Sequence, residues 1–222
     1  MPHKGSLKYE GVDMQQADLT AIAQRLATSL RGANDTFCLQ IMRLLAFGRP
    51  VSREQLAAAL HVPLAEIHAV LRQLSDAEFD ESGNIVGWGL TLIPTPHRFQ
   101  VNGQTLFTWC ALDALTYPAL LYLPARVASP CPITGMQVTL FVTSEGIKNL
   151  EPTNAVVSLV IPELSQICDC CREDFCDQVH FFNSLEAAST WQASRREALI
   201  LSVDDAYQIG QMVARYRYET LF

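Results

Sequence analysis

The chain has 222 residues, 49% hydrophobic and 18% charged, a balance that predicts a compact protein with a sizeable core and excludes a disordered chain. Its formal charge of −7 argues against a nucleic-acid-binding protein, because phosphate contacts need clustered Lys and Arg side chains. The longest apolar runs, such as Ala155 to Ile161, are too short to cross a bilayer, and the first residues lack the apolar core of a signal peptide. We therefore expect a cytoplasmic protein.

Seven cysteines are many for a cytoplasmic chain of this length. Their number is odd and no secretion signal precedes them, so we do not expect a disulfide framework. Reduced thiols in this number favour soft-metal binding or thiolate chemistry, because sulfur ligands select soft metal ions. For any single cysteine, however, a role as a small hydrophobic residue of the core is the simpler interpretation.

Residues 17–82 are predicted to form a helical part behind a polar tail over residues 1–16. Apolar residues at helical spacing predict two helices, and a capping box of Ser52 and Gln55 then opens a third. Pro63 begins a fourth helix, which runs to Leu74. Short helices joined by a tight turn, with a hairpin beyond them, match the winged-helix plan.

A DNA-binding role for this part has little support. Its second short helix carries only Arg72 as a strong cation, with Glu66 against it, whereas a recognition helix needs cations for phosphates and donors for base edges. We therefore interpret the helical part as a packing module. A thiol-based soft-metal-binding or metal-sensing regulator stays open as the alternative function.

Residues 83–222 are predicted to form an α+β domain with mostly antiparallel strands, because the strands lie too close together for a regular βαβ series. Asn102-Gly103 suits a type I′ turn between the strands of a hairpin. Strands are expected at 85–92, 98–107, 125–128, 137–142, 155–161, 179–182 and 199–203, and helices near 109–117, 185–196 and 204–216.

The segment from Phe107 to Leu115 places Cys110 three residues before Asp113, where the hairpin runs into a helix that should bend or end before Pro118. Residues at this spacing share a helix face. With Thr108 as the cap, Cys110 would lie in the first turn, where free N–H groups and the helix dipole favour a thiolate. A thiolate beside a proton-carrying acid suits chemistry on a soft atom. A buried cysteine beside a solvated aspartate is the open alternative.

A second group of thiols, at positions 168, 170, 171 and 176, falls within nine residues. Zinc is one candidate ligand, yet the spacing differs from the paired cysteines of structural zinc sites. Cys176 directly precedes an apolar segment over 179–182, so it can face a pocket from a rigid support. Cys38, Cys131 and His180 are best explained as structural residues of the core.

Several segments, in this order, together resemble the organomercurial lyase (alkylmercury lyase) family, which cleaves carbon–mercury bonds. The resemblance covers the chain from about residue 35 onward, and the segments that carry it are Gly48–Ser52, Asp80–Leu92, Trp109–Asp113, Pro118–Leu120, Ala125–Val127, Cys131–Gly135, Glu151–Pro152, Ala155–Val160 and Phe175–Phe182.

The resemblance implies a winged-helix-like N-terminal part followed by an α+β catalytic domain. It implies that Cys110, Asp113 and Cys176 are the catalytic trio and the ligands of mercury as substrate and product. Trp109, beside Cys110, is expected to line the pocket, where its ring face would attract the cationic mercury. Asp177 stands where members of the family place another cysteine, and the additional cysteines are not a family feature.

The resemblance also implies how the chemistry is supported. No organic cofactor is expected. External small thiols or a mercuric reductase would accept the Hg²⁺ product, and no nucleic-acid or membrane partner is implied.

Overall fold

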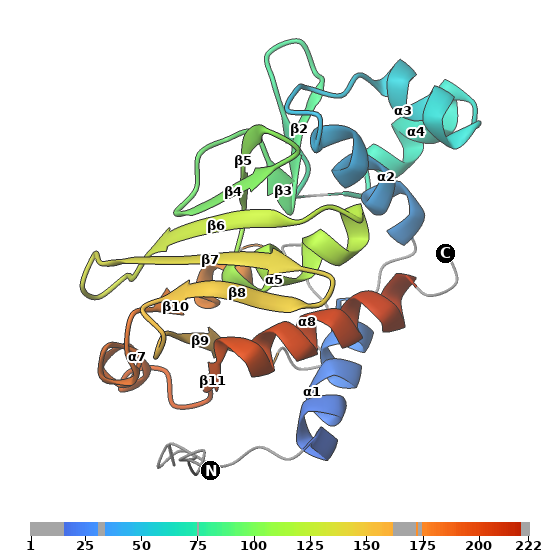
Figure 1. Cartoon of the computed structure of the whole chain (residues 1–222). Coiled ribbons are helices and arrows are strands. Elements are labelled where there is room, and N and C mark those ends of the chain that lie inside the picture. Colours follow the sequence, from blue (N-terminus) through green and yellow to red (C-terminus); the bar gives the residue numbers. More distant parts are fainter. Residues whose placement is uncertain (1–15, 31–33, 75, 162–171, 173–174, 219–222) are drawn as a thin grey trace.

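The computed structural model describes residues 16–30, 34–74, 76–161, 172 and 175–218. Helices α1 to α4 come first, an antiparallel sheet follows, and the long helix α8 lies beside α1 and α5 (Figure 1). This confirms the α+β class and the helical N-terminal part. The helix bounds are α1 Gln16–Ser29, α2 Asp35–Leu45, α3 Arg53–Leu60, α4 Leu64–Leu71, α5 Ala111–Leu121, α7 Leu185–Gln192 and α8 Val203–Tyr218.

The capping box that begins α3 is formed as predicted. The Gln55 backbone N–H donates to Ser52 Oγ at 3.2 Å, and the Ser52 N–H donates to the Gln55 side chain at 2.9 Å. His61 ends the helix in the left-handed conformation with φ of 57°. Among the described residues, none of the helices is long and apolar enough to cross a membrane.

In the part of the chain that the structure describes, the strands form one large sheet and one small sheet, and every strand pair is antiparallel, in agreement with the prediction of mostly antiparallel strands. The larger sheet has the order β1-β2-β3-β5-β4-β6-β7-β8 and the smaller has β10-β9-β11. The strand bounds are β1 Glu78–Phe79, β2 Ile85–Trp88, β3 Leu90–Thr91, β4 His97–Val101, β5 Gln104–Thr108, β6 Ala125–Pro130, β7 Gln137–Thr143, β8 Gly146–Glu151, β9 Val156–Leu159, β10 Phe181–Phe182 and β11 Leu199–Ser202.

The sequence predicted the hairpin turn at Asn102-Gly103 correctly but missed the turn at Gly89. Asn102 and Gly103 have φ of 51° and 73°, as a type I′ turn requires. The single strand expected over 85–92 is wrong, because Gly89 adopts φ of 67° and turns the chain, so that β2 and β3 pair with each other. The strand β8 was missed, because its sequence lacks alternation of apolar and polar residues.

Helix α5 lies in the core between α8 and the larger sheet, and most of its residues are buried (Figure 1). The helix does not end before Pro118, as one of the two expected outcomes had it, because it continues to Leu121. Pro118 has no N–H to donate along the helix. Burial of the helix on several sides offsets that local cost, and Tyr122, with φ of 56°, ends the helix instead.

Helices α2 and α8 are joined by an ion pair that is largely withdrawn from water. Arg217 Nη2 lies 2.6 Å from Asp35 Oδ1, and the two side chains are 18% and 11% exposed. Burial opposes the charge of Arg217, but Tyr218 and Asp35 outweigh it and raise the pKa of the guanidinium. The charge therefore persists inside the fold and depends on its partner.

We expect Asp35→Asn to lower the free energy of unfolding by on the order of 3 kcal/mol, because it leaves the Arg217 charge without its counter-ion. Urea unfolding measures this change. The matched control is Glu145→Gln, which breaks the exposed pair of Glu145 with Lys148 and should cost less than about 1 kcal/mol. Equal losses in the two variants would show that the Asp35–Arg217 pair does not stabilise the fold more than a surface pair.

Candidate active site

The first element of the site is the N-terminus of α5, where Cys110 is the capping residue. Its backbone is extended, with φ of −144° and ψ of 173°, and its Sγ accepts a hydrogen bond from the Asp113 N–H at 3.4 Å. Thr108 was expected to be the cap, but its hydroxyl donates to the Cys110 carbonyl at 3.0 Å. The sulfur thus takes the place that a hydroxyl or carboxylate oxygen usually occupies at a helix start.

The second element is a 3₁₀ turn, Cys176–Gln178, which leads into β10. The expected strand over 179–182 is therefore shorter than predicted. The turn is fixed by the Val179 N–H, which donates to the Cys176 carbonyl at 3.1 Å, and by Ser158 Oγ, which donates to the Gln178 carbonyl at 2.9 Å. The Ala111 N–H donates to the Val179 carbonyl at 3.0 Å and ties this turn to the start of α5.

The two elements bring the predicted trio together. The two sulfur atoms and a carboxylate oxygen of Asp113 all lie within 4.8 Å of one another. Cys176 Sγ donates to Asp113 Oδ2 at 3.9 Å. Cys110 and Cys176 are 0% and 3% exposed, so the two sulfurs face the interior, whereas Asp113 is half-buried. Two soft thiol ligands and one carboxylate are the donor set that favours a soft metal ion.

Burial dominates the electrostatics of the trio. Burial raises the pKa of the Cys110 thiol to about 11, although hydrogen bonding from Cys176 acts in the opposite direction and lowers it. It also raises the pKa of Asp113 to about 6, against hydrogen bonds from Tyr117 and Cys110 that lower it. The helix start was expected to favour a thiolate, and burial outweighs that effect. Near neutral pH the resting site therefore holds a protonated Cys110 thiol beside a carboxylate that can accept its proton.

Tyr117 is a residue of the site that the sequence analysis did not identify. It follows Asp113 by one helical turn on α5, is buried, and its hydroxyl is hydrogen-bonded to the Asp113 carboxylate. Burial, followed by the nearby Asp113 and both cysteines, raises the pKa of Tyr117 well above its usual value. The i, i+4 spacing from Asp113 is the signal that could have indicated it.

Trp109 lies next to Cys110 in the chain and is 7% exposed. Trp88 contacts it edge-on at 5.8 Å between ring centroids, and the Arg172 guanidinium lies 5.3 Å from its ring centroid. Trp109 Nε1 is buried and has no hydrogen-bond partner among the described residues. In this structure, the cation on the face of the Trp109 ring is the guanidinium of Arg172. The sequence analysis did not identify Arg172.

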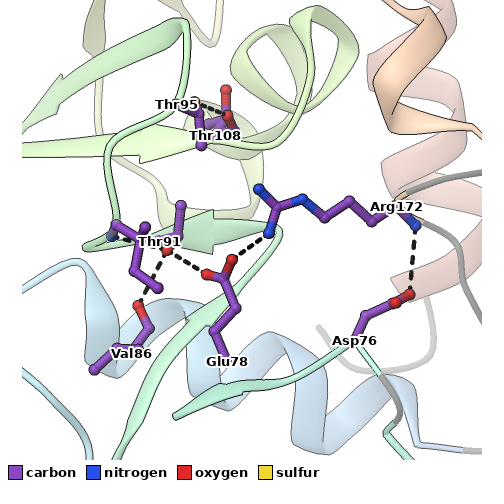
Figure 2. Close-up of polar contacts among 8 residues, drawn as sticks. Asp76, Glu78, Val86, Thr91, Thr95, Thr108 and Arg172 are labelled. Carbon is purple, nitrogen blue, oxygen red and sulfur yellow. Dashed lines mark hydrogen bonds and ion pairs between the residues drawn. The ribbon is translucent and has the colours of Figure 1, made fainter. Parts of the chain in front are cut away.

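Polar contacts attach Arg172 to the first strands of the large sheet (Figure 2). Its guanidinium pairs with Glu78 of β1, and its backbone N–H donates to Asp76 Oδ2 at 3.4 Å. The Glu78 carboxylate also accepts from Thr91 Oγ1 at 2.5 Å. A Cβ at Gly87 would lie 1.8 Å from this carboxylate, so the missing side chain leaves room for it. Arg172, four residues before Cys176 in the sequence, is thereby fixed to the sheet.

The remaining cysteines and His180 lie outside the trio. Cys38 and Cys131 are free and buried in separate core clusters, as the structural interpretation predicts. His180 stacks on His97 at 6.2 Å between ring centroids, consistent with a packing role. The cysteines at 168, 170 and 171 lie outside the described residues, so their role stays open. Asp177, directly after Cys176, is exposed.

Comparison with known proteins agrees with this arrangement. A family model described as "Alkylmercury lyase" matches residues 90–215, and one described as "Helix-turn-helix domain of alkylmercury lyase" matches residues 19–89. Alkylmercury lyase of Staphylococcus epidermidis is 44% identical over 178 residues, which cover 79% of this chain and 81% of that protein. The enzymes of Streptomyces lividans and Pseudomonas putida are 43% and 40% identical and cover 86% and 89% of this chain, and 89% and 94% of their own length.

The fold also matches a solved structure, the mercury-bound form of MerB2, with a TM-score of 0.70. The two chains are 22% identical, and the match covers 90% of this chain and 99% of that one. The family models and the curated relatives, together with two thiols and a carboxylate within 4.8 Å, lead to one assignment. The chain belongs to the alkylmercury lyase family.

Proposed function

We propose that this protein cleaves the carbon–mercury bond of organomercurials by protonolysis, with Cys110 and Cys176 as the mercury ligands and Asp113 as the proton carrier. The observation that carries this proposal is the meeting of the two thiols and the carboxylate within 4.8 Å. Trp109, beside Cys110, is proposed to line the substrate side of the site.

The first step is proton transfer followed by ligand exchange. The Asp113 carboxylate accepts the proton of a cysteine thiol, and the resulting thiolate binds the mercury of R–Hg–X and displaces X⁻. The pKa of Asp113, raised to about 6 by burial, lies closer to neutral pH than that of an ordinary aspartate. Asp113 can therefore hold this proton until the next step with less cost than a solvated carboxyl group.

Cleavage follows when the second cysteine joins the first on mercury as a thiolate, and its proton leaves with the displaced X⁻ as HX. Carbon bound to mercury is a poor base, and two thiolates donate electron density to the metal and make that carbon more basic. Asp113 then delivers its proton to the carbon. The electron pair of the C–Hg bond becomes the new C–H bond, so a hydrocarbon leaves, Hg²⁺ remains on the two thiolates, and no external oxidant or reductant is consumed.

Turnover requires the removal of Hg²⁺ from the two sulfurs. We propose that small thiols, or the thiols of a mercuric reductase, take the metal by exchange. Such chemistry belongs in a compartment that keeps thiols reduced, which for this chain we take to be the cytoplasm.

Methane in the headspace above the protein, methylmercury and excess thiol tests the function directly. We expect continuous release, because external thiols free the site after each turnover. A matched sample without protein gives the background. Tight binding of methylmercury without methane would indicate a scavenger and contradict the proposal. Metal-dependent retardation of DNA without methane would instead support a regulator.

A further inference from the structure

The Tyr117 hydroxyl lies against the catalytic carboxylate, yet the mechanism above gives it no task. Tyr117 shares the face of α5 that carries Asp113, one turn further along, and Cys110 caps the start of the same helix. Along α5, Asp113 therefore lies between Cys110 and Tyr117. Hydrogen bonding by the Tyr117 hydroxyl lowers the pKa of the Asp113 carboxyl, and Asp113 Oδ2 lies 3.9 Å from Cys176 Sγ.

We infer that Tyr117 is a positioning residue, whose hydroxyl holds the Asp113 carboxylate in the orientation that faces the two sulfurs. This inference rests on the proposed proton-carrying role of Asp113. An aspartate that is free to rotate would spend much of its time turned away from the thiols and from the carbon that receives the proton. Misplacement of a reacting group by about 1 Å can cost on the order of 10²-fold in rate.

Gly89 provides an independent reason for the position of the hydroxyl. A Cβ at Gly89 would lie 2.0 Å from the Tyr117 hydroxyl oxygen, so only the absence of a side chain leaves this place open. Gly89 has φ of 67°, and its carbonyl accepts a hydrogen bond from the Trp109 N–H at 2.9 Å. The backbone of Gly89 is thus fixed against the residue before Cys110, and it confines the hydroxyl at the edge of the trio.

The tyrosine is proposed to act as a hydrogen-bond donor to the carboxylate. Burial, followed by the neighbouring Asp113, Cys176 and Cys110, raises the pKa of Tyr117 well above its usual value, which favours the protonated hydroxyl. The proton that reaches carbon still comes from a cysteine by way of Asp113. Tyr117 therefore affects the geometry of the transfer without supplying or accepting a proton.

The test separates capture of substrate from cleavage in a single turnover with phenylmercury. Capture is measured as the loss of titratable thiol, and cleavage as the release of benzene. We expect Tyr117→Phe to capture phenylmercury at a rate within about twofold of the wild type and to release benzene on the order of 10 to 100 times more slowly. The control is Tyr207→Phe, which removes a hydroxyl that donates to the Thr143 carbonyl at 2.9 Å and should leave both rates unchanged.

A second pair of variants moves the hydroxyl without removing it. Gly89→Ala should displace Tyr117 and slow benzene release, whereas Gly103→Ala should not, although both glycines have positive φ. A Cβ at Gly103 meets nothing within 4 Å, so Gly103→Ala measures only the effect of placing an alanine at positive φ. In the wild-type background, Gly89→Ala should slow benzene release by a certain factor. In the Tyr117→Phe background the same change should slow release by a smaller factor, because both changes act through one hydrogen bond.

Two results would overturn the inference: benzene release by Tyr117→Phe at the wild-type rate, or equal losses of capture and release. Equal losses would mean that Tyr117 only forms a wall of the pocket. Should Tyr117→Phe fail to fold, the comparison of Gly89→Ala with Gly103→Ala decides alone, and equal release rates in those two variants would also overturn it. A wild-type protein that captures phenylmercury without releasing benzene contradicts the proposed function itself, so the two failures are distinct.

Discussion

Cys110→Ala and Cys176→Ala should each reduce hydrocarbon release from phenylmercury, in the presence of excess thiol, by on the order of 10³-fold or more. Each variant leaves one sulfur, which can hold the mercury but cannot supply the second thiolate that makes the carbon basic. Since the two sulfurs and Asp113 act as a unit, the double variant should lose little more than either single one. Gas chromatography of the released benzene measures the effect.

Two controls show whether the loss belongs to these two thiols. Cys38→Ala removes a buried thiol in α2, which burial makes inert by raising its pKa to about 12, and should keep wild-type release. The triple replacement of the cysteines at 168, 170 and 171 by serine should also keep most of the activity. Near-wild-type turnover of either single variant would remove that cysteine from the mechanism, and collapse of the triple variant would show that the choice of Cys176 is incomplete.

Asp113→Asn should uncouple binding from chemistry. The amide preserves the shape of the side chain but carries no transferable carboxyl proton, so phenylmercury should still be captured while benzene release falls on the order of 10²- to 10⁴-fold. The captured complex should accumulate, with one organic group retained for each bound mercury. Mass spectrometry of the unfragmented protein detects that group. Failure to bind phenylmercury would instead indicate that Asp113 is needed to build the site.

The same variant should be more stable than the wild type at about pH 8. Burial raises the folded-state pKa of Asp113 from 3.8 to about 6, so ionisation disfavours the folded state by at most about 3 kcal/mol at higher pH. The contribution of the protonated carboxyl is present at low pH and is lost as the pH rises through about 6. The stability gain of Asp113→Asn in urea unfolding should therefore shrink as the pH falls, and a constant gain would contradict this account.

Features that depend on neighbouring residues were predictable from the sequence. The capping box at Ser52, the turn at Asn102-Gly103 and the nearness of Cys110 to Asp113 all follow from spacings of a few residues. Cys176 is different, because it lies 63 residues from Asp113 and only the folded sheets bring it there. No local pattern identifies it, and the family resemblance was needed.

Two of the expectations failed because packing outweighs local preference. Pro118 ought to end α5, but the buried helix continues past it. The start of α5 ought to favour a Cys110 thiolate, but desolvation raises the pKa of the thiol. Tyr117 was missed although its i, i+4 spacing from Asp113 was a usable signal, and Arg172 was missed because an arginine in a polar segment has no distinctive spacing. Their partners, Gly89 and Glu78, are known only from the folded chain.

The hydrogen bond from the Ala111 N–H to the Val179 carbonyl has a consequence for metal release. It joins the residue after Cys110 to a residue three positions after Cys176. We therefore expect the distance between the two sulfurs to be set before a metal binds. A chelate whose two arms are already held at the right distance loses little entropy when it closes on one atom. The same rigidity keeps the arms from drifting apart afterwards. Under the proposed mechanism, we therefore expect the metal to leave by attack of an incoming ligand rather than by spontaneous opening of the chelate.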